Sequence, residues 1–127
     1  MTLWKSSLRH DRISAQEKLT AIAIGQLQSW VAAGGTVLFG TDIGAIDYDP
    51  NEEYALMGRA GLSFRQILAS LTTAPAAEFG DSDRLGRIDV GLEADLVVLR
   101  DDPSRDVKGF AAVAYTVQGG NIIYSQP

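Results

Sequence analysis

The chain contains no cysteine and only one histidine, His10. The absence of cysteine excludes disulfide bridges, thiolate zinc sites and a cysteine nucleophile, and says nothing about the redox compartment. His10 lies in a polar stretch, and the chain has no G-x-S-x-G nucleophile elbow for it to serve. We therefore expect His10 to be a surface residue.

Long apolar runs and basic clusters are also missing. No stretch approaches the about 18 apolar residues of a membrane span, and the N-terminus lacks the apolar core of a signal peptide. The net charge is −5, from 11 Lys and Arg against 16 Asp and Glu. This balance argues against nucleic acid as the main partner. The sequence predicts a cytoplasmic protein with neither a membrane nor a nucleic acid as partner.

The 127 residues suit one domain or a piece of a larger one. Residues 14–33 have helical apolar spacing, with a capping box formed by Ser14 and Glu17 and a stop at the Gly34–Gly35 pair. Residues 36–40, TVLFG, then form an unbroken apolar stretch. Such a run is typical of a strand that is buried on both faces, as in parallel sheets.

Two further helices are expected after an acidic loop. One begins at Pro50, after a cap at Asp49, and ends at Gly61, because proline suits the first helical position and glycine the end. The next begins with a second capping box, formed by Ser63 and Gln66. The first two-thirds of the chain is therefore predicted to be helix, strand and helices.

The end of the chain has a different pattern. Pro75 is expected to break the third helix, with one more turn before Gly80. From residue 81 onward the sequence predicts loops and turns, one clear strand at residues 96–99, and a hairpin around the Gly119–Gly120 pair.

Acidic residues cluster after the predicted strand: Asp42, Asp47, Asp49, Glu52 and Glu53. A calcium loop starting at Asp47 fails, because the sixth position, which must be glycine, is Glu52 and the twelfth, the bidentate acid, is Gly58. Most of these acids are better interpreted as a solvated loop and as favourable charges at a helix N-terminus. Asp42 differs because it follows the strand directly, where barrel enzymes place functional groups. The alternative is a turn residue that bonds its own backbone.

Three segments then carry a resemblance: GTVLFGTDIG, EEYALMGRAGLSFRQILASLTTAPAAEFG and LGRIDVGLEADLVVLRDDPSRD. In order and spacing they resemble the C-terminal portion of a metal-dependent amidohydrolase of the imidazolonepropionase and Xaa-Pro dipeptidase (prolidase)-like branch. The resemblance implies an α/β fold. Residues 1–80 would be the last strand and flanking helices of a TIM-type (β/α)8 barrel, and residues 81–127 the C-terminal strands of a small composite β-sandwich.

The resemblance also implies roles. Asp42 would be the catalytic residue and a ligand of zinc or another divalent metal, whereas Asp95 would be structural, at the start of a strand. The histidine ligands of the family, including an H-x-H pair, have no counterpart in this chain. We therefore expect a fragment of an enzyme that hydrolyses carbon–nitrogen bonds, inactive and without metal when alone.

The expected partners follow from this reading. They are the missing N-terminal barrel portion or further copies of the chain in a homo-oligomer, with a small-molecule amide substrate only if the barrel is completed. The alternative is a non-catalytic, self-associating or partner-binding module derived from the same family.

Overall fold

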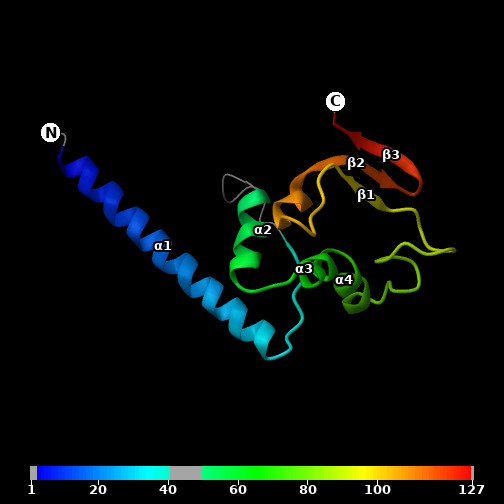
Figure 1. Ribbon diagram of the computed structural model, residues 1–127, viewed down its shortest axis with the longest axis horizontal. Helices are drawn as coiled ribbons and strands as arrows, with labels where there is room; N and C mark the ends of the chain where they lie inside the picture. Colours follow the sequence, from blue (N-terminus) through cyan, green and yellow to red (C-terminus); the bar gives the residue numbers. More distant parts are fainter. Residues whose placement is uncertain (1–2, 41–49, 127) are drawn as a thin grey trace.

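The computed structural model describes residues 3–40 and 50–126, and the side chains from residue 15 onward within these ranges. The elements in chain order are α1 (Leu3–Ala32), α2 (Pro50–Arg59), α3 (Phe64–Leu71), α4 (Thr73–Glu78), β1 (Leu96–Leu99), the 3-10 helix η1 (Val107–Ala111), β2 (Val113–Gln118) and β3 (Asn121–Ser125). Figure 1 shows α1 projecting from a body in which α2, α3 and α4 lie between α1 and the sheet. In its described part the protein is thus a mixed α/β fragment with four α-helices and a three-stranded sheet.

The first helix is longer than the sequence pattern indicates. It begins at Leu3, so the expected start at the capping box of Ser14 and Glu17 is wrong. No glycine or proline lies between residues 3 and 24, and nothing in the backbone interrupts the helix before Ser14. The predicted stop is confirmed, because α1 ends at Ala32 and Gly34 follows with φ of 81°, a left-handed conformation that glycine adopts without strain. Among the described residues, no helix is long and apolar enough to cross a membrane.

Residues 35–40 belong to no helix or strand, so the strand expected at 36–40 is wrong for this chain. A strand is defined by hydrogen bonds to a neighbouring strand. Here the backbone N–H of Phe39 instead donates to the carbonyl of Ser70 in α3, at 3.1 Å. The apolar segment keeps its contact with the core but has no neighbouring strand in the described part of the chain.

The boundaries of α2 and α3 follow the sequence closely. Pro50 is the first residue of α2, and Gly61 follows the helix with φ of 86°. The second capping box is confirmed: the amide of Gln66 donates to Ser63 Oγ at 3.4 Å, and the amide of Ser63 donates to Gln66 Oε1 at 2.9 Å. The predicted cap at Asp49 lies outside the described residues.

The break between α3 and α4 falls at Thr72 rather than at Pro75. Pro75 lies in the first turn of α4, where the missing N–H leaves no intrahelical bond unmade. Thr72 Oγ1 donates to the carbonyl of Leu68 at 2.7 Å, which occupies one of the free carbonyls at the end of α3. The helix α4 ends at Glu78, before the expected stop at Gly80, which has φ of 78°.

The C-terminal sheet is antiparallel, with strand order β1-β2-β3. Strand β1 confirms the expected strand at 96–99, and pairs with β2. The predicted hairpin joins β2 to β3 around Gly119 and Gly120, whose φ angles are 54° and 81°. Both glycines have the left-handed conformation of a type I′ turn, which suits the twist of the two strands.

The core lies between α2, α3 and η1. Its buried residues are Tyr54, Met57, Ala60, Leu62, Ile67 and Phe110. Aromatic rings connect these elements: Tyr54 of α2 lies 5.4 Å from Phe110 of η1, which stacks on Phe64 at 5.7 Å. Among the described side chains of helix α1, Ile24, Leu27 and Val31 pack against this core and are partly buried.

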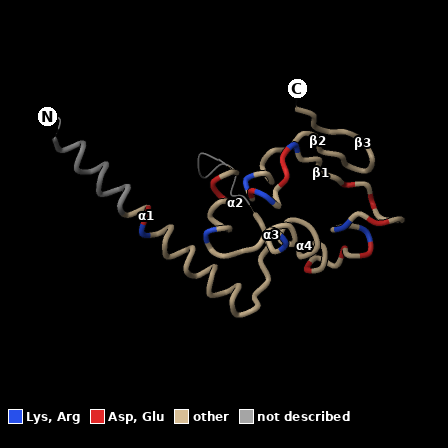
Figure 2. The backbone as a smooth tube through the Cα atoms, in the orientation of Figure 1, with Lys and Arg blue, Asp and Glu red and all other residues tan. Residues whose placement is uncertain are grey.

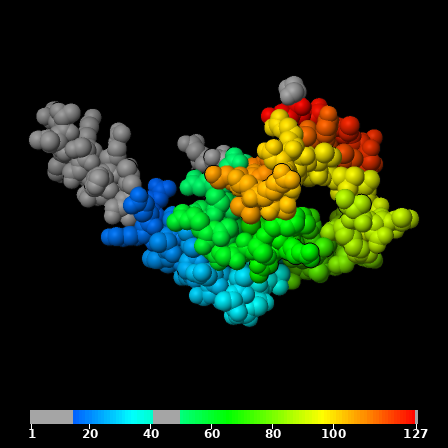
Figure 3. Space-filling view, viewed as in Figure 1, coloured from blue at the N-terminus to red at the C-terminus, as the bar shows by residue number. Residues whose placement is uncertain are grey.

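The sheet meets this core through Leu99 of β1, and β3 lies away from it. Figure 3 shows the sheet at one end of the molecule, with a hollow between the strands and the helices below. All five residues of β3 are exposed, among them Ile122 at 65% and Ile123 at 61%. Apolar side chains on an exposed, edge strand are typical of a surface that another element covers.

Candidate functional site

Asp42, the predicted catalytic residue and metal ligand, lies within residues 41–49, outside the described residues. Asp47 lies there too. The structure does describe the chain on both sides, up to Gly40 and again from Pro50.

The chain that leads to Asp42 is held on two helices. The ring of Phe39 stacks on that of Tyr54 in α2, with centroids 4.9 Å apart and planes at 8°. The Phe39 amide bonds to Ser70 in α3. Ser70 is 2% exposed, and its hydroxyl donates to the carbonyl of Ile67 at 2.7 Å, so this buried polar group is paired. Phe39, three residues before Asp42, is thus anchored through both its side chain and its backbone.

The chain that follows is anchored by α2. Glu52 and Glu53 lie in its first turn, as expected for acids that favour a helix N-terminus. Tyr54 and Met57 of the same helix are buried in the core. Phe39 and helix α2, the described parts of the chain on either side of residues 41–49, therefore belong to one packed unit.

No metal centre is formed by the part of the chain that the structure describes. Among the described side chains, those of residues 15–40 and 50–126, no three His, Cys, Asp or Glu groups lie close enough together to hold a metal ion. Because a catalytic zinc site takes about three protein ligands, these residues do not fit one.

Asp95 has the structural position that was expected. Its carboxylate accepts a hydrogen bond from the backbone N–H of Gly119, at 2.7 Å, and the N–H of Gly120 donates to the carbonyl of the neighbouring Ala94 at 3.0 Å. The start of β1 is thereby tied to the β2–β3 turn. The sequence did not indicate this partner, because 24 residues separate the two groups.

A groove of about 790 Å3 lies between the start of α2 and the segment from Arg100 to Ala112. Its charged lining residues are Arg100, Asp101, Asp102, Arg105, Asp106 and Lys108. The positive and negative groups balance, and Figure 2 shows both colours alternating along this segment.

Most of these charged groups have local partners. Arg100 donates to Gln126, and Arg105 pairs with Asp102 at 3.4 Å. Asp106 accepts from the amide of Lys108 at 3.0 Å and caps η1. Hydrogen bonds from Ser104 lower the pKa of the Asp102 carboxyl. The groove therefore consists of a well-bonded loop rather than an assembled binding site.

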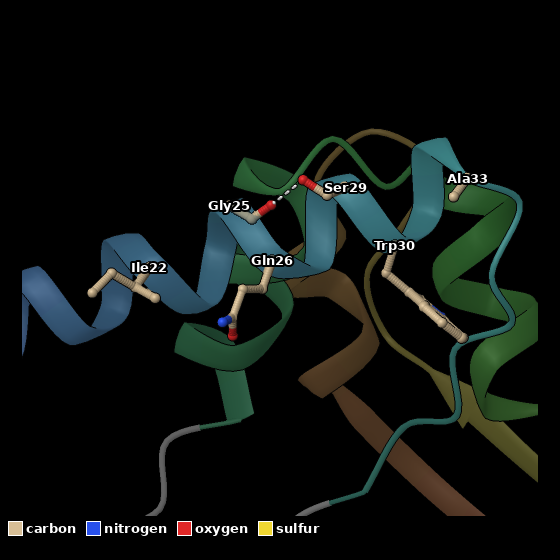
Figure 4. Close-up of a pocket in the computed structure, with 6 residues that line it drawn as sticks. All are labelled: Ile22, Gly25, Gln26, Ser29, Trp30 and Ala33. Carbon is tan, nitrogen blue, oxygen red and sulfur yellow. Dashed lines mark hydrogen bonds between the residues drawn. The ribbon is translucent and has the colours of Figure 1, made fainter.

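A second hollow, of about 560 Å3, lies on the outer face of α1. Figure 4 shows its six lining residues, with Trp30 at one end and Ile22 at the other. Ser29 Oγ donates to the carbonyl of Gly25 at 2.9 Å, so its hydroxyl bonds within the helix. The surface is open and mostly apolar, and it has no group suited to catalysis.

Comparison with known proteins gives the context for these observations. The sequence profile of the amidohydrolase family matches residues 3–124. The imidazolonepropionase of Thermoplasma acidophilum is 29% identical over 99 residues, which are 73% of this chain and 24% of that protein.

Solved structures agree with this similarity. A crystal structure of a Xaa-Pro dipeptidase with bound methionine matches 81% of this chain and 25% of its own, with a TM-score of 0.73 and 24% identity. The putative prolidase of Bifidobacterium longum matches 80% of this chain and 26% of its own, with a TM-score of 0.69 and 26% identity.

The chain thus spans about a quarter of the length of the relatives that it matches. The resemblance to imidazolonepropionases and prolidases is confirmed, and the match to the amidohydrolase family as a whole extends over nearly the whole chain. The protein belongs to the amidohydrolase family, of which it represents a fragment.

Proposed function

We propose that this chain is the C-terminal portion of a metal-dependent amidohydrolase that hydrolyses carbon–nitrogen bonds once the remaining barrel is present. The observation that carries the proposal is the family match over residues 3–124 in a chain one quarter as long as its relatives. Residues 1–80 would be the end of the barrel, and residues 81–127 the C-terminal share of a β-sandwich. The chain alone would be inactive.

The surfaces of the described residues support an incomplete fold. Segment 36–40 is apolar yet has no strand beside it, and β3 is exposed along its length. Both would gain neighbours in a complete barrel and sandwich, which would cover their unpaired edges. The partner would therefore be the N-terminal portion of an amidohydrolase, on the same gene or on a separate chain.

Asp42 is the catalytic residue and metal ligand in this proposal. In the sequence it closely follows segment 36–40, which would be a strand in a complete barrel, and barrel enzymes place functional groups at the C-terminal ends of strands. A carboxylate at that point can accept the proton of the attacking water and deliver it to the departing nitrogen. Cyclic amides, dipeptides and related amides form the substrate class.

The DNA upstream of Met1 tests the proposal first. A coding sequence with an H-x-H motif in an alternating strand–helix pattern would support a divided or longer enzyme. If nothing of that kind is encoded, the enzyme reading fails for this gene.

Complementation tests the activity. The chain would be co-expressed with that upstream portion, or with the first three-quarters of a prolidase-like relative, and assayed with zinc on Xaa-Pro dipeptides and cyclic amides. We expect hydrolysis that depends on both parts and falls by about a hundredfold or more with Asp42→Asn, as for removal of a general base. Asp47→Asn is the matched control and should retain activity. Equal activity in the Asp42→Asn variant would overturn the assignment.

Zinc content gives an independent measurement. The purified chain alone should hold far less than one zinc per molecule, because one candidate ligand cannot retain a catalytic metal. Stoichiometric zinc that disappears with Asp42→Ala would contradict the expected inactivity of the chain alone.

A second candidate is a self-associating module without catalytic function. The exposed side chains of Leu19 and Ile22, one turn apart on α1, and of Ile122 on β3 favour it, since exposed apolar groups are typical of contacts between molecules. Light scattering at micromolar concentration should then show a dimer or higher assembly. A clean monomer would count against self-association and leave the enzyme fragment as the better reading.

A further inference from the structure

Trp30 has an unusual position for a large aromatic residue. Its side chain is 57% exposed, so burial in the core is not its main contribution. Its indole N–H donates to the backbone carbonyl of Thr36 at 2.9 Å, across the turn that ends α1. Figure 4 shows the ring directed from α1 toward the segment that descends after the helix. The side chain thus spans the exit from α1.

Gly35 is fitted to this ring. A β-carbon added at Gly35 would overlap the Trp30 indole, whereas one added at the neighbouring Gly34 would meet no atom within 4 Å. A glycine is therefore required at each of the two positions for a different physical reason. Gly34 provides a backbone with φ of 81°, and Gly35 provides the space in which the indole lies. The Gly35 amide also donates to the carbonyl of Trp30 at 2.9 Å.

The Trp30 indole, bonded to Thr36 and packed over Gly35, forms a contact that we call the clamp. The clamp holds the segment that enters the core. Three residues after Thr36, Phe39 bonds to Ser70 and stacks on Tyr54. Residues 36–39 are therefore held at both ends, by the indole at one end and by α2 and α3 at the other. A segment without a neighbouring strand has no sheet ladder to define its register, so side chains must do so.

We propose that Trp30 is a positioning residue. Its hydrogen bond to Thr36 and its contact with Gly35 set the register in which segment 36–40 enters the core. The consequence for Asp42, two residues beyond Gly40, rests on the proposed function, but the clamp itself does not.

Amide hydrogen exchange on the full 127-residue chain tests the clamp. Trp30→Phe keeps an aromatic ring over Gly35 and removes the indole donor. Loss of one hydrogen bond of this kind should speed exchange of the Phe39 amide about five- to tenfold. The amide of Ile67, which donates to the carbonyl of Ser63 at 3.0 Å within the core, should exchange at an unchanged rate.

Two outcomes of this experiment would overturn the proposal. If the Phe39 amide exchanges no faster in the variant, the indole bond does not hold the segment. If the Phe39 and Ile67 amides accelerate equally, Trp30 contributes general stability and has no positioning role.

A double-mutant cycle tests the fit between ring and glycine. Gly35→Ala should accelerate Phe39 exchange about tenfold in the wild-type background, because the β-carbon displaces the indole. In a Trp30→Ala background the same change should add little. Gly34→Ala is the control, since its effect comes from the backbone angle and should be the same in both backgrounds. A Gly35→Ala effect that is independent of Trp30 would contradict the clamp.

Failure here and failure of the proposed function are distinguishable. If complementation yields no hydrolysis while Trp30→Phe releases Phe39, the clamp stands and the enzyme reading falls. If complementation succeeds, Trp30→Phe should reduce kcat with little change in KM, because a misplaced Asp42 affects chemistry more than substrate binding. An unchanged kcat would show that Trp30 has no effect on the catalytic step and contributes to the fold of the fragment alone.

Discussion

The carboxylate of Asp95 and the backbone N–H of Gly119 are joined by a hydrogen bond of 2.7 Å. The bond links the residue before β1 to the turn between β2 and β3, so it continues the β1–β2 pairing beyond the end of the two strands. Gly119 has a left-handed backbone with φ of 54°, as the first loop residue of a type I′ turn requires. An acid placed just before a strand thus stabilises a turn far along the chain.

Replacement of Asp95 should weaken this sheet. We expect Asp95→Ala to lower the free energy of unfolding by about 1 kcal/mol, the usual net value of one exposed hydrogen bond. Asp95→Asn keeps a side-chain carbonyl oxygen and should lose less than half of that. Urea denaturation of the three proteins measures the difference. Equal stability of Asp95→Ala and the natural chain would show that the turn holds without this acceptor.

Gly86 should tolerate alanine poorly for two reasons. Its φ is 92°, and an added β-carbon would lie 2.6 Å from the Cβ of Ala76 in α4. We expect Gly86→Ala to cost about 3 kcal/mol, from backbone strain and overpacking together. Gly91 has φ of 90° with no atom within 4 Å of such a carbon, so Gly91→Ala should cost only about 1 kcal/mol. Thermal unfolding distinguishes the two, and similar costs would mean that the loop moves away from α4.

Phe110 connects η1 to the helical core. It is 6% exposed and contacts the rings of Tyr54 and Phe64, so Phe110→Ala should cost about 3–5 kcal/mol. Phe79, 72% exposed, is the matched control, and its alanine variant should change stability by less than about 0.5 kcal/mol. Chemical denaturation gives both values. A small loss at Phe110 would show that η1 does not depend on this contact.

The pKa of the Asp102 carboxyl should be below its ordinary value of 3.8, chiefly because the hydroxyl and amide of Ser104 donate to its Oδ1 at 2.7 and 3.0 Å. A lowered pKa in the folded state means that this turn is stabilised at neutral pH. That stabilisation disappears as the pH falls through the lowered pKa. Carboxyl carbon shifts in an NMR titration measure the pKa directly. Ser104→Ala should raise it toward 3.8, and an unchanged value would contradict the hydroxyl as main cause.

Local signals predicted much of the fold. Pro50 begins α2, Ser63 and Gln66 cap α3, and the paired glycines at 119 and 120 turn the hairpin. Each of these features depends on residues that are neighbours in the chain, where backbone conformation and side-chain bonds act directly. The family resemblance was likewise readable from the order of the motifs.

Other local signals were misleading because longer-range context decided the outcome. The capping box at Ser14 lies within a helix that continues from Leu3, and a cap acts only where a helix begins. The apolar run at 36–40 has the composition of a buried strand, but it bonds to α3 in the described structure. Strand formation requires a second strand, which composition cannot supply.

The sequence by itself determined the end of α1, the starts of α2 and α3, the hairpin and the family to which the chain belongs. The tertiary structure alone decided that Asp95 accepts a hydrogen bond from Gly119 and that the Trp30 ring packs over Gly35. It also decided that Phe39 contacts both α2 and α3. The physical reason is distance along the chain. Propensities and caps act within a turn or two, whereas these contacts form only when packing brings separated residues together.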